Sequence, residues 1–279
     1  MKIIGYKFKN FCSFKDEQEV SFKIPKSAAE DCLSYESDVG FVNSTICVLG
    51  HNGSGKTNLL KPLPFLAFLL SSSFRLSKDD ELPFSPFAGL EDEESEIEVE
   101  YETNSQLLKY KIVFNQDSIL TEEISIKTTS RYSYIVKRVT KSNGTEVKFK
   151  APNNSVNTRF WKNFQSNISV MSALLTIGES KQEDIVAQYV APLTTMIKTN
   201  ISEYGKNHVN MSSIISASEK LYDDPDKFEL LKEIMLDLDL GLDDIRLEEM
   251  ELISEAKEKS EKVIMPKGVH IIEKSRTLE

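Results

Sequence analysis

A glycine-rich segment, VLGHNGSGKTNLL at residues 48–60, constrains the fold more than any other part of the chain. Gly50 to Thr57 match the pattern G-x-x-x-x-G-K-[ST] at every fixed position. The preceding segment, STICVLG, is apolar and rich in β-branched residues, which predicts a buried strand at residues 44–49. The following segment, TNLLKPLPFLAFLLSSSF, is apolar and long enough for a helix. The sequence therefore predicts a phosphate-binding loop between a strand and a helix.

The residue types in this loop suit the phosphates of a nucleotide. Its glycines allow a tight turn that brings backbone N–H groups close to anionic oxygens, and the start of the next helix adds a positive end. Lys56 supplies a charge for the β- and γ-phosphates, and the Thr57 hydroxyl can bind Mg²⁺. We therefore expect ATP and Mg²⁺ as cofactors. The expected nucleotide-binding residues are Gly50, Asn52, Gly53, Ser54, Gly55, Lys56, Thr57 and Asn58.

Composition favours a cytoplasmic protein without a membrane partner. The N-terminus, MKIIGYKFKNF, alternates like a strand and lacks the apolar core of a signal peptide. The most apolar stretch, LPFLAFLLSS, is too short to span a bilayer. The cysteines Cys12, Cys32 and Cys47 are widely spaced and match no metal-binding or disulfide pattern, which suits a reducing compartment.

Charge is unevenly distributed along this chain of net charge −10. Residues 127–162 contain nine basic residues and one acidic residue, Glu146, whereas residues 219–261 contain sixteen acidic and six basic residues. The basic segment is a candidate surface for DNA or an acidic partner. A solvated face of a sheet is the alternative explanation.

Hydrophobic periodicity changes from strand-like to helical along the chain. Residues 1–24 read as two strands, residues 26–42 as irregular polar chain, and residues 96–150 as an antiparallel meander of five short strands. Pro62 and Pro64 predict that the helix after the phosphate loop kinks or ends near Lys61.

From about residue 157 apolar residues recur at helical spacing. The apolar residues of the first of these segments are expected in the core: Trp161, Phe164, Met171 and Leu174.

Several segments together resemble a known family. GYKFKNFCSFKDEQEVSF followed by GHNGSGKTNLL resembles the N-terminal lobe of ABC-type ATPases of the SMC, RecF and OLD group. LPFSPFAG, SNISVMSALLTIG and LDLGLDDIRLEE look like the compact prokaryotic ATPases of that group found in phage-defence operons. The resemblance implies an α/β fold: a P-loop NTPase of ABC type whose N-terminal lobe carries an antiparallel β-subdomain and a helical insertion or arm. The implied domains are the lobe at 1–156, the helical segment at 157–262 and the start of a returning strand at 263–279, with a C-terminal lobe absent.

The resemblance also implies motifs that this chain lacks. The family binds nucleotide between two heads, with a serine-glycine signature and a Walker B strand ending in Asp-Glu. Here IMLDLDLGLDD, residues 234–244, is the only apolar run that ends in acids, and we interpret it as a helix end followed by an acidic loop. Hydrolysis is therefore expected to need a missing lobe, and the catalytic residues are unknown.

The turn Asn10–Phe14 matches the family's N-F-x-S-F strand pair and implies contacts beside the adenine from Phe11, Ser13 and Phe14. Cys12 stands where the family often has a basic residue, so a basic contact at that position is not expected. For Phe11 and Phe14 a place in the core is the favoured alternative.

Three functions remain open. The first is a nucleotide-gated sensor or scaffold in anti-phage defence, which forms homo-oligomers through its heads or helical arm and acts with an effector protein. The second is a DNA repair or recombination ATPase of RecF or SMC type that contacts DNA through residues 127–162. The third is a nucleotide-binding assembly module that does not hydrolyse ATP. A GTPase is disfavoured because the chain has no N-K-x-D motif.

Overall fold

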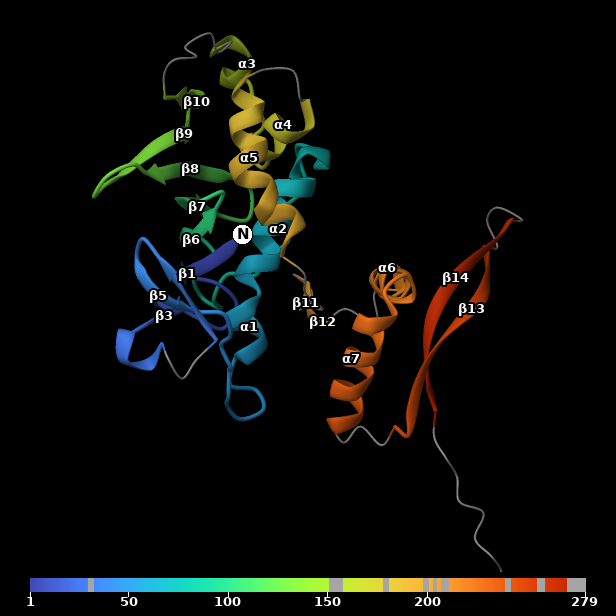
Figure 1. Ribbon diagram of the computed structural model, residues 1–279. Helices are drawn as coiled ribbons and strands as arrows, with labels where there is room; N and C mark the ends of the chain where they lie inside the picture. The colour runs from blue at the N-terminus through green and yellow to red at the C-terminus, as the bar shows by residue number, and fades with distance from the viewer. Residues whose placement is uncertain are drawn as a thin grey trace, which may run out of the picture. The chain divides into compact units, whose positions relative to one another are not determined.

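In the computed structural model the chain forms two compact units (Figure 1). The first unit is Met1–Lys206 and the second is Asn207–Glu279. The described residues are 1–29, 33–150, 158–177, 181–197, 201–202, 205–206, 211–238, 242–254 and 259–269. None of the helices in these ranges is long and apolar enough to cross a membrane.

A seven-stranded antiparallel sheet dominates the first unit, with strand order β10-β9-β8-β7-β6-β1-β2. Neighbouring strands β6 to β10 are consecutive in sequence, so the predicted meander is confirmed. Along β6 every second side chain is buried, as the alternating sequence SEIEVEYET requires. The strands are β1 (Lys2–Lys9), β2 (Gln18–Ser21), β6 (Ser95–Thr103), β7 (Gln106–Phe114), β8 (Ile119–Lys127), β9 (Tyr132–Lys141) and β10 (Gly144–Phe149).

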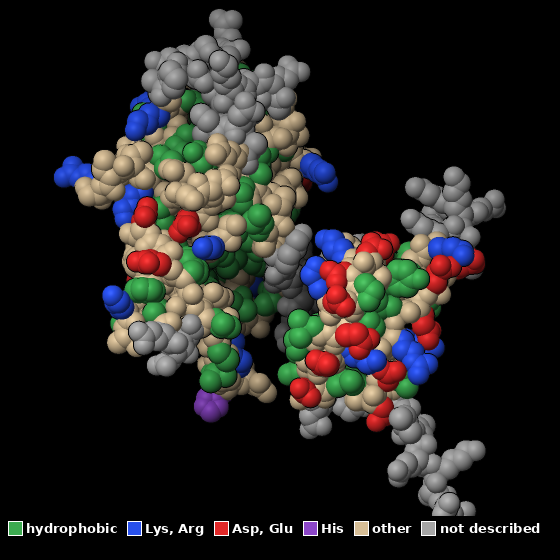
Figure 2. Space-filling model, viewed as in Figure 1, with side chains coloured by type: hydrophobic (Ala, Val, Ile, Leu, Met, Phe, Trp, Pro, Cys, Tyr) green, Lys and Arg blue, Asp and Glu red, His purple; other side chains and the backbone are tan. Residues whose placement is uncertain are grey.

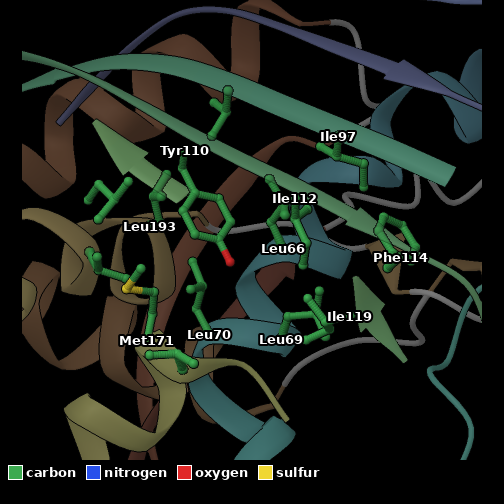
Figure 3. Close-up of a cluster of buried hydrophobic side chains, with 14 of the residues drawn as sticks. Leu66, Leu69, Leu70, Ile97, Tyr110, Ile112, Phe114, Ile119, Met171 and Leu193 are labelled. Atoms are coloured by element: carbon green, nitrogen blue, oxygen red, sulfur yellow. The ribbon is translucent and has the colours of Figure 1, made fainter. Parts of the chain in front are cut away.

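Helix α2 (Pro62–Ser72) packs its leucines against this sheet. Leu66, Leu69 and Leu70 are at most 1% exposed. Figure 3 shows them beside Ile112 and Tyr110 of β7. Helices α4 (Val170–Ile177) and α5 (Lys181–Thr195) add further buried side chains to the same core, so this layer of helices closes over the sheet.

The expected core positions of the helical segment are confirmed for Trp161, Met171 and Leu174, which are buried. Phe164 is partly buried and packs against the same core. Trp161 belongs to the short helix α3 (Thr158–Lys162).

The helix after the phosphate loop is interrupted where the prolines predict. Helix α1 (Lys56–Leu60) ends before Lys61, and Pro62 occupies the first turn of α2. A proline is tolerated there because the N–H that it lacks would have no partner within the helix.

The prediction of irregular chain at residues 26–42 is wrong in part. After the 3₁₀ turn Lys26–Ala28, β4 (Ser34–Ser37) and β5 (Gly40–Asn43) form a hairpin, and β3 (Lys23–Ile24) completes a three-stranded sheet. These strands are two to four residues long, so their sequences carry almost no alternation.

The predicted buried strand at residues 44–49 is also wrong. Residues 45–50 have no regular secondary structure, and Leu49 is 86% exposed. A strand forms only where a neighbouring strand pairs with its N–H and C=O groups. No strand among the described residues pairs with this segment.

The second unit contains helices α6 (Met211–Tyr222) and α7 (Pro225–Asp237) and a hairpin of β13 (Asp244–Ser254) and β14 (Lys259–Val269). The prediction of a helical segment extending to residue 262 is therefore wrong beyond α7. Glu248 and Glu249 of β13 pair across the hairpin with Lys267 and Lys262 of β14. The partners in each ion pair lie 13 or more positions apart in the sequence, so the pairs can be recognised only once the register of the hairpin is known. The small hairpin of β11 (Ile201–Ser202) and β12 (Gly205–Lys206) ends the first unit.

Candidate nucleotide-binding site

The phosphate loop, Gly50–Thr57, has a backbone that its glycines make possible. Gly53 and Gly55 have φ angles of 79° and 89°, a left-handed conformation that favours glycine. At Gly50 a Cβ atom would lie 2.7 Å from the Ser54 hydroxyl oxygen. Residues 51–54 are exposed, so the loop is open to a ligand.

The Lys56 side chain is hydrogen-bonded to the backbone of the phosphate loop. Its ammonium donates hydrogen bonds of 2.6 Å to the carbonyl oxygens of Gly50 and His51. Lys56 is also the first residue of α1, whose first-turn N–H groups have no partner within the helix. The Tyr6 hydroxyl fixes the end of α1 by donating to the carbonyl of Leu59 at 3.0 Å.

The N-terminal turn, Asn10–Lys15, packs directly against the phosphate loop. Asn58 donates a hydrogen bond of 3.1 Å to the Ser13 hydroxyl. A Cβ atom at Gly55 would lie 3.1 Å from that hydroxyl and 3.2 Å from the Phe14 ring. Residues 13, 14, 55 and 58 are therefore brought together by the fold, and Gly55 leaves room for the turn.

Asn10, which has no predicted role, holds the N-terminal turn in place. It is 1% exposed and has a φ of 50°, a conformation that asparagine tolerates better than most residues. Its amide donates to the carbonyls of Leu90 and Glu93 at 3.1 Å and accepts from the N–H of Phe87 at 2.9 Å. The asparagine of the N-F-x-S-F motif was a signal for this role, because it is the residue type best suited to a left-handed turn with side-chain bonds.

The Phe11 ring lies in the core, the favoured alternative for this residue, so its expected adenine contact is corrected. Its ring is 1% exposed and packs against the rings of Phe8, Phe65 and Phe84. A ring enclosed in this way cannot stack on a base. Ser13, which is exposed, and Phe14, which is half-buried, remain the candidates.

The acidic run at 234–244 forms no strand up to Asp237, as expected from the interpretation as a helix end. Asp237 ends α7, and Asp244 begins β13. Asp244 accepts hydrogen bonds from Lys232 and Arg246, which lower its pKa to about 2. Asp244 is therefore engaged in local ion pairs. No group of three or more His, Cys, Asp or Glu residues in the described chain is arranged to hold a metal ion.

Much of the basic segment 127–162 is already engaged within the sheet. Arg138 is fully buried, and its guanidinium donates to the carbonyls of Ile168 and Ser166 at 2.6 and 2.9 Å. Three lysines, Lys137, Lys141 and Lys148, form ion pairs with Glu123 or Glu146. These four cations are engaged as the interpretation as a sheet face expects, and a DNA contact of the segment stays a prediction.

Residues 46–259 match the model of the protein family described as "AAA domain, putative AbiEii toxin, Type IV TA system". The matched segment covers well over half of the chain and begins just before the phosphate loop. The chain belongs to this family. No curated protein matches the sequence.

This AAA-domain family and the mixed α/β fold with its large antiparallel sheet fit a P-loop NTPase. The match supports the P-loop ATPase family that the resemblance implied, and the narrower assignment to the SMC, RecF and OLD group stays a prediction.

Proposed function

We propose that the chain is the ATP-binding module of a P-loop ATPase that acts in anti-phage defence or a related toxin–antitoxin system. The observation that carries the nucleotide proposal is the geometry of Gly50–Thr57. Two left-handed glycines, an exposed loop and the first turn of a helix lie beside one lysine and one threonine. The defence role rests on the family description and on the resemblance to phage-defence ATPases.

In this proposal the loop N–H groups bind the phosphates and Lys56 neutralises their β- and γ-oxygens. The hydrogen bonds from Lys56 to the carbonyls of Gly50 and His51 keep its ammonium beside the loop, so the side chain needs only a short movement to reach a bound phosphate. The Thr57 hydroxyl supplies a ligand to Mg²⁺ that the nucleotide brings with it. Ser13 and Phe14 border the loop on the side where the base is proposed to lie.

Residues 45–50 support the further proposal that turnover needs another element. This segment enters the phosphate loop without a strand partner among the described residues, and it exposes Leu49. An added strand or a second head would order the segment and complete the site. The chain alone is therefore proposed to bind ATP with little turnover, and to hydrolyse it in a homo-oligomer or with an effector protein.

The test is a titration of the chain with Mg-ATP, in which binding and phosphate release are measured together. Lys56→Ala removes the charged donor and is expected to weaken binding by about 10- to 100-fold. Lys78→Ala is the matched control, because Lys78 is an exposed lysine that follows α2 and lies outside the phosphate loop. Equal affinity in the two variants would refute the nucleotide site. Steady turnover by the chain alone would refute the need for another element.

A further inference from the structure

Helix α7 of the second unit exposes an apolar stripe. None of its residues is buried. Leu230, Ile234 and Leu238, which follows the helix, are 58%, 51% and 62% exposed, and Leu231 is 37% exposed. Single exposed apolar side chains are ordinary on protein surfaces, but four at this spacing on one helix form a continuous patch.

Helical geometry separates the stripe from the side of α7 that packs within the unit. Successive residues are rotated by about 100°, so Leu230, Ile234 and Leu238 span an arc of roughly 80°, with Leu231 just beyond it. Lys232 points to the opposite side, where its ammonium lies 2.7 Å from a carboxylate oxygen of Asp244 in β13. The stripe therefore faces away from the hairpin.

Carboxylates border the stripe on its other side. Asp226, Glu229, Glu233 and Asp237 fall within the next arc of about 80°, and none of them forms an ion pair with another described residue. Lys227, the one cation within the stripe, is engaged by Asp224, the residue that caps α7. Figure 2 shows apolar, acidic and basic side chains intermingled on the visible face of this unit.

We propose that this stripe, with its acidic border, binds an amphipathic helix of a partner protein whose apolar face is flanked by lysines or arginines. The stripe runs from Leu230 to Leu238, which is about the span over which a docking helix places anchors at i, i+4 and i+7. The unpaired carboxylates then meet cations of the partner. A second copy of the chain fits less well, because it would place two rows of carboxylates against each other. The inference is independent of nucleotide binding, since none of these residues belongs to the phosphate loop.

The probe is a synthetic 20-residue helical peptide with leucines at i, i+4 and i+7 and flanking lysines. A twin peptide carries glutamate in place of each lysine. Binding to the full chain is measured by fluorescence anisotropy at several salt concentrations. We expect the lysine peptide to bind, the glutamate twin to bind at least about tenfold more weakly, and added salt to reduce the difference.

Two pairs of variants locate the site. Ile234→Ser is expected to weaken peptide binding by about tenfold, whereas Met250→Ser, at a residue of β13 that is also 51% exposed, leaves it unchanged. The double variant Glu229→Lys with Glu233→Lys is expected to abolish the preference for the lysine peptide, and Glu251→Lys, on β13, is its control. Circular dichroism of each variant verifies that the helices are retained.

Three outcomes would overturn the proposal: no binding of the lysine peptide, equal binding of the two peptides, or equal effects at Ile234 and Met250. Sedimentation of the chain alone supplies a further test. Self-association that Ile234→Ser abolishes would show that the stripe is occupied by a second copy, and would likewise overturn the inference of a basic partner.

Discussion

Glu122 on β8 joins the sheet to helix α4 through a buried polar cluster. Its side chain is fully buried. One carboxylate oxygen accepts from the Tyr110 hydroxyl at 2.9 Å and from the Ser169 hydroxyl, and the other accepts from the N–H of Val170 at 2.8 Å. The Arg138 guanidinium lies 3.9 Å away. Glu122 thus satisfies the first N–H of α4 and provides the nearby arginine with a counter-charge.

Glu122→Gln keeps the shape of this side chain and removes its charge. An amide has only one acceptor oxygen, so its NH₂ group must either face the N–H of Val170 or make the Tyr110 and Ser169 hydroxyls accept where they now donate to a carboxylate. Burying an unsatisfied donor costs about 1–3 kcal/mol, and leaving a buried cation without its partner adds to this. The expected loss of unfolding free energy is about 3–5 kcal/mol.

Glu123→Gln is the matched control, because Glu123 is the next residue of β8 and points to the opposite face. It forms a 2.8 Å ion pair with Lys137 and its side chain is 31% exposed, so the loss should stay below about 1 kcal/mol. Urea unfolding, followed by the fluorescence of the single tryptophan, Trp161, measures both variants. Losses that agree within about 0.5 kcal/mol would show that burial of Glu122 does not determine its contribution.

Three further predictions test the site and its supports. Asn10→Ala removes three hydrogen bonds and should lower the free energy of unfolding, measured in urea, by about 3 kcal/mol. A decrease below about 1 kcal/mol would exclude a role of Asn10 in holding the turn. Burial raises the pKa of Tyr6 from 10.0 to about 12, so the stabilising effect of this side chain is present below pH 10 and is lost as the pH rises toward 12. The difference in unfolding free energy between wild type and Tyr6→Phe should therefore shrink over this range. A difference that stays constant would contradict the prediction. Gly144→Ala places a Cβ 2.5 Å from the Lys162 carbonyl oxygen at a φ of 123°. It should lower the melting temperature clearly more than Gly40→Ala, where φ is 102° and the Cβ meets nothing within 4 Å. Equal decreases in melting temperature would contradict the steric argument.

The antiparallel meander and the break at Lys61 were predictable because their causes are local. Alternating burial is encoded directly in the sequence of each strand, and proline acts on its own turn of helix. The phosphate loop was predictable for the same reason, since its glycines are required by its own backbone angles.

Other features depend on residues far apart in the chain. The expected strand at residues 44–49 has strand-like composition, but none of the described residues pairs with it. The β13–β14 hairpin was not predicted, because its acidic and basic residues form ion pairs only once the two strands pair in register. Phe11 and Phe14 look equivalent in the motif. In the fold the Phe11 ring is buried, whereas the Phe14 ring lies against Gly55.

The sequence by itself determined that this chain carries a phosphate loop, a meander sheet and a helix broken by proline, because each follows from neighbouring residues. The tertiary structure alone decided that Asn10 and Ser13 support the loop, that Glu122 is a buried anchor and that α7 presents an unpartnered face. Each of those roles depends on which distant groups exclude water from a side chain or bond to it, and local sequence does not contain that information.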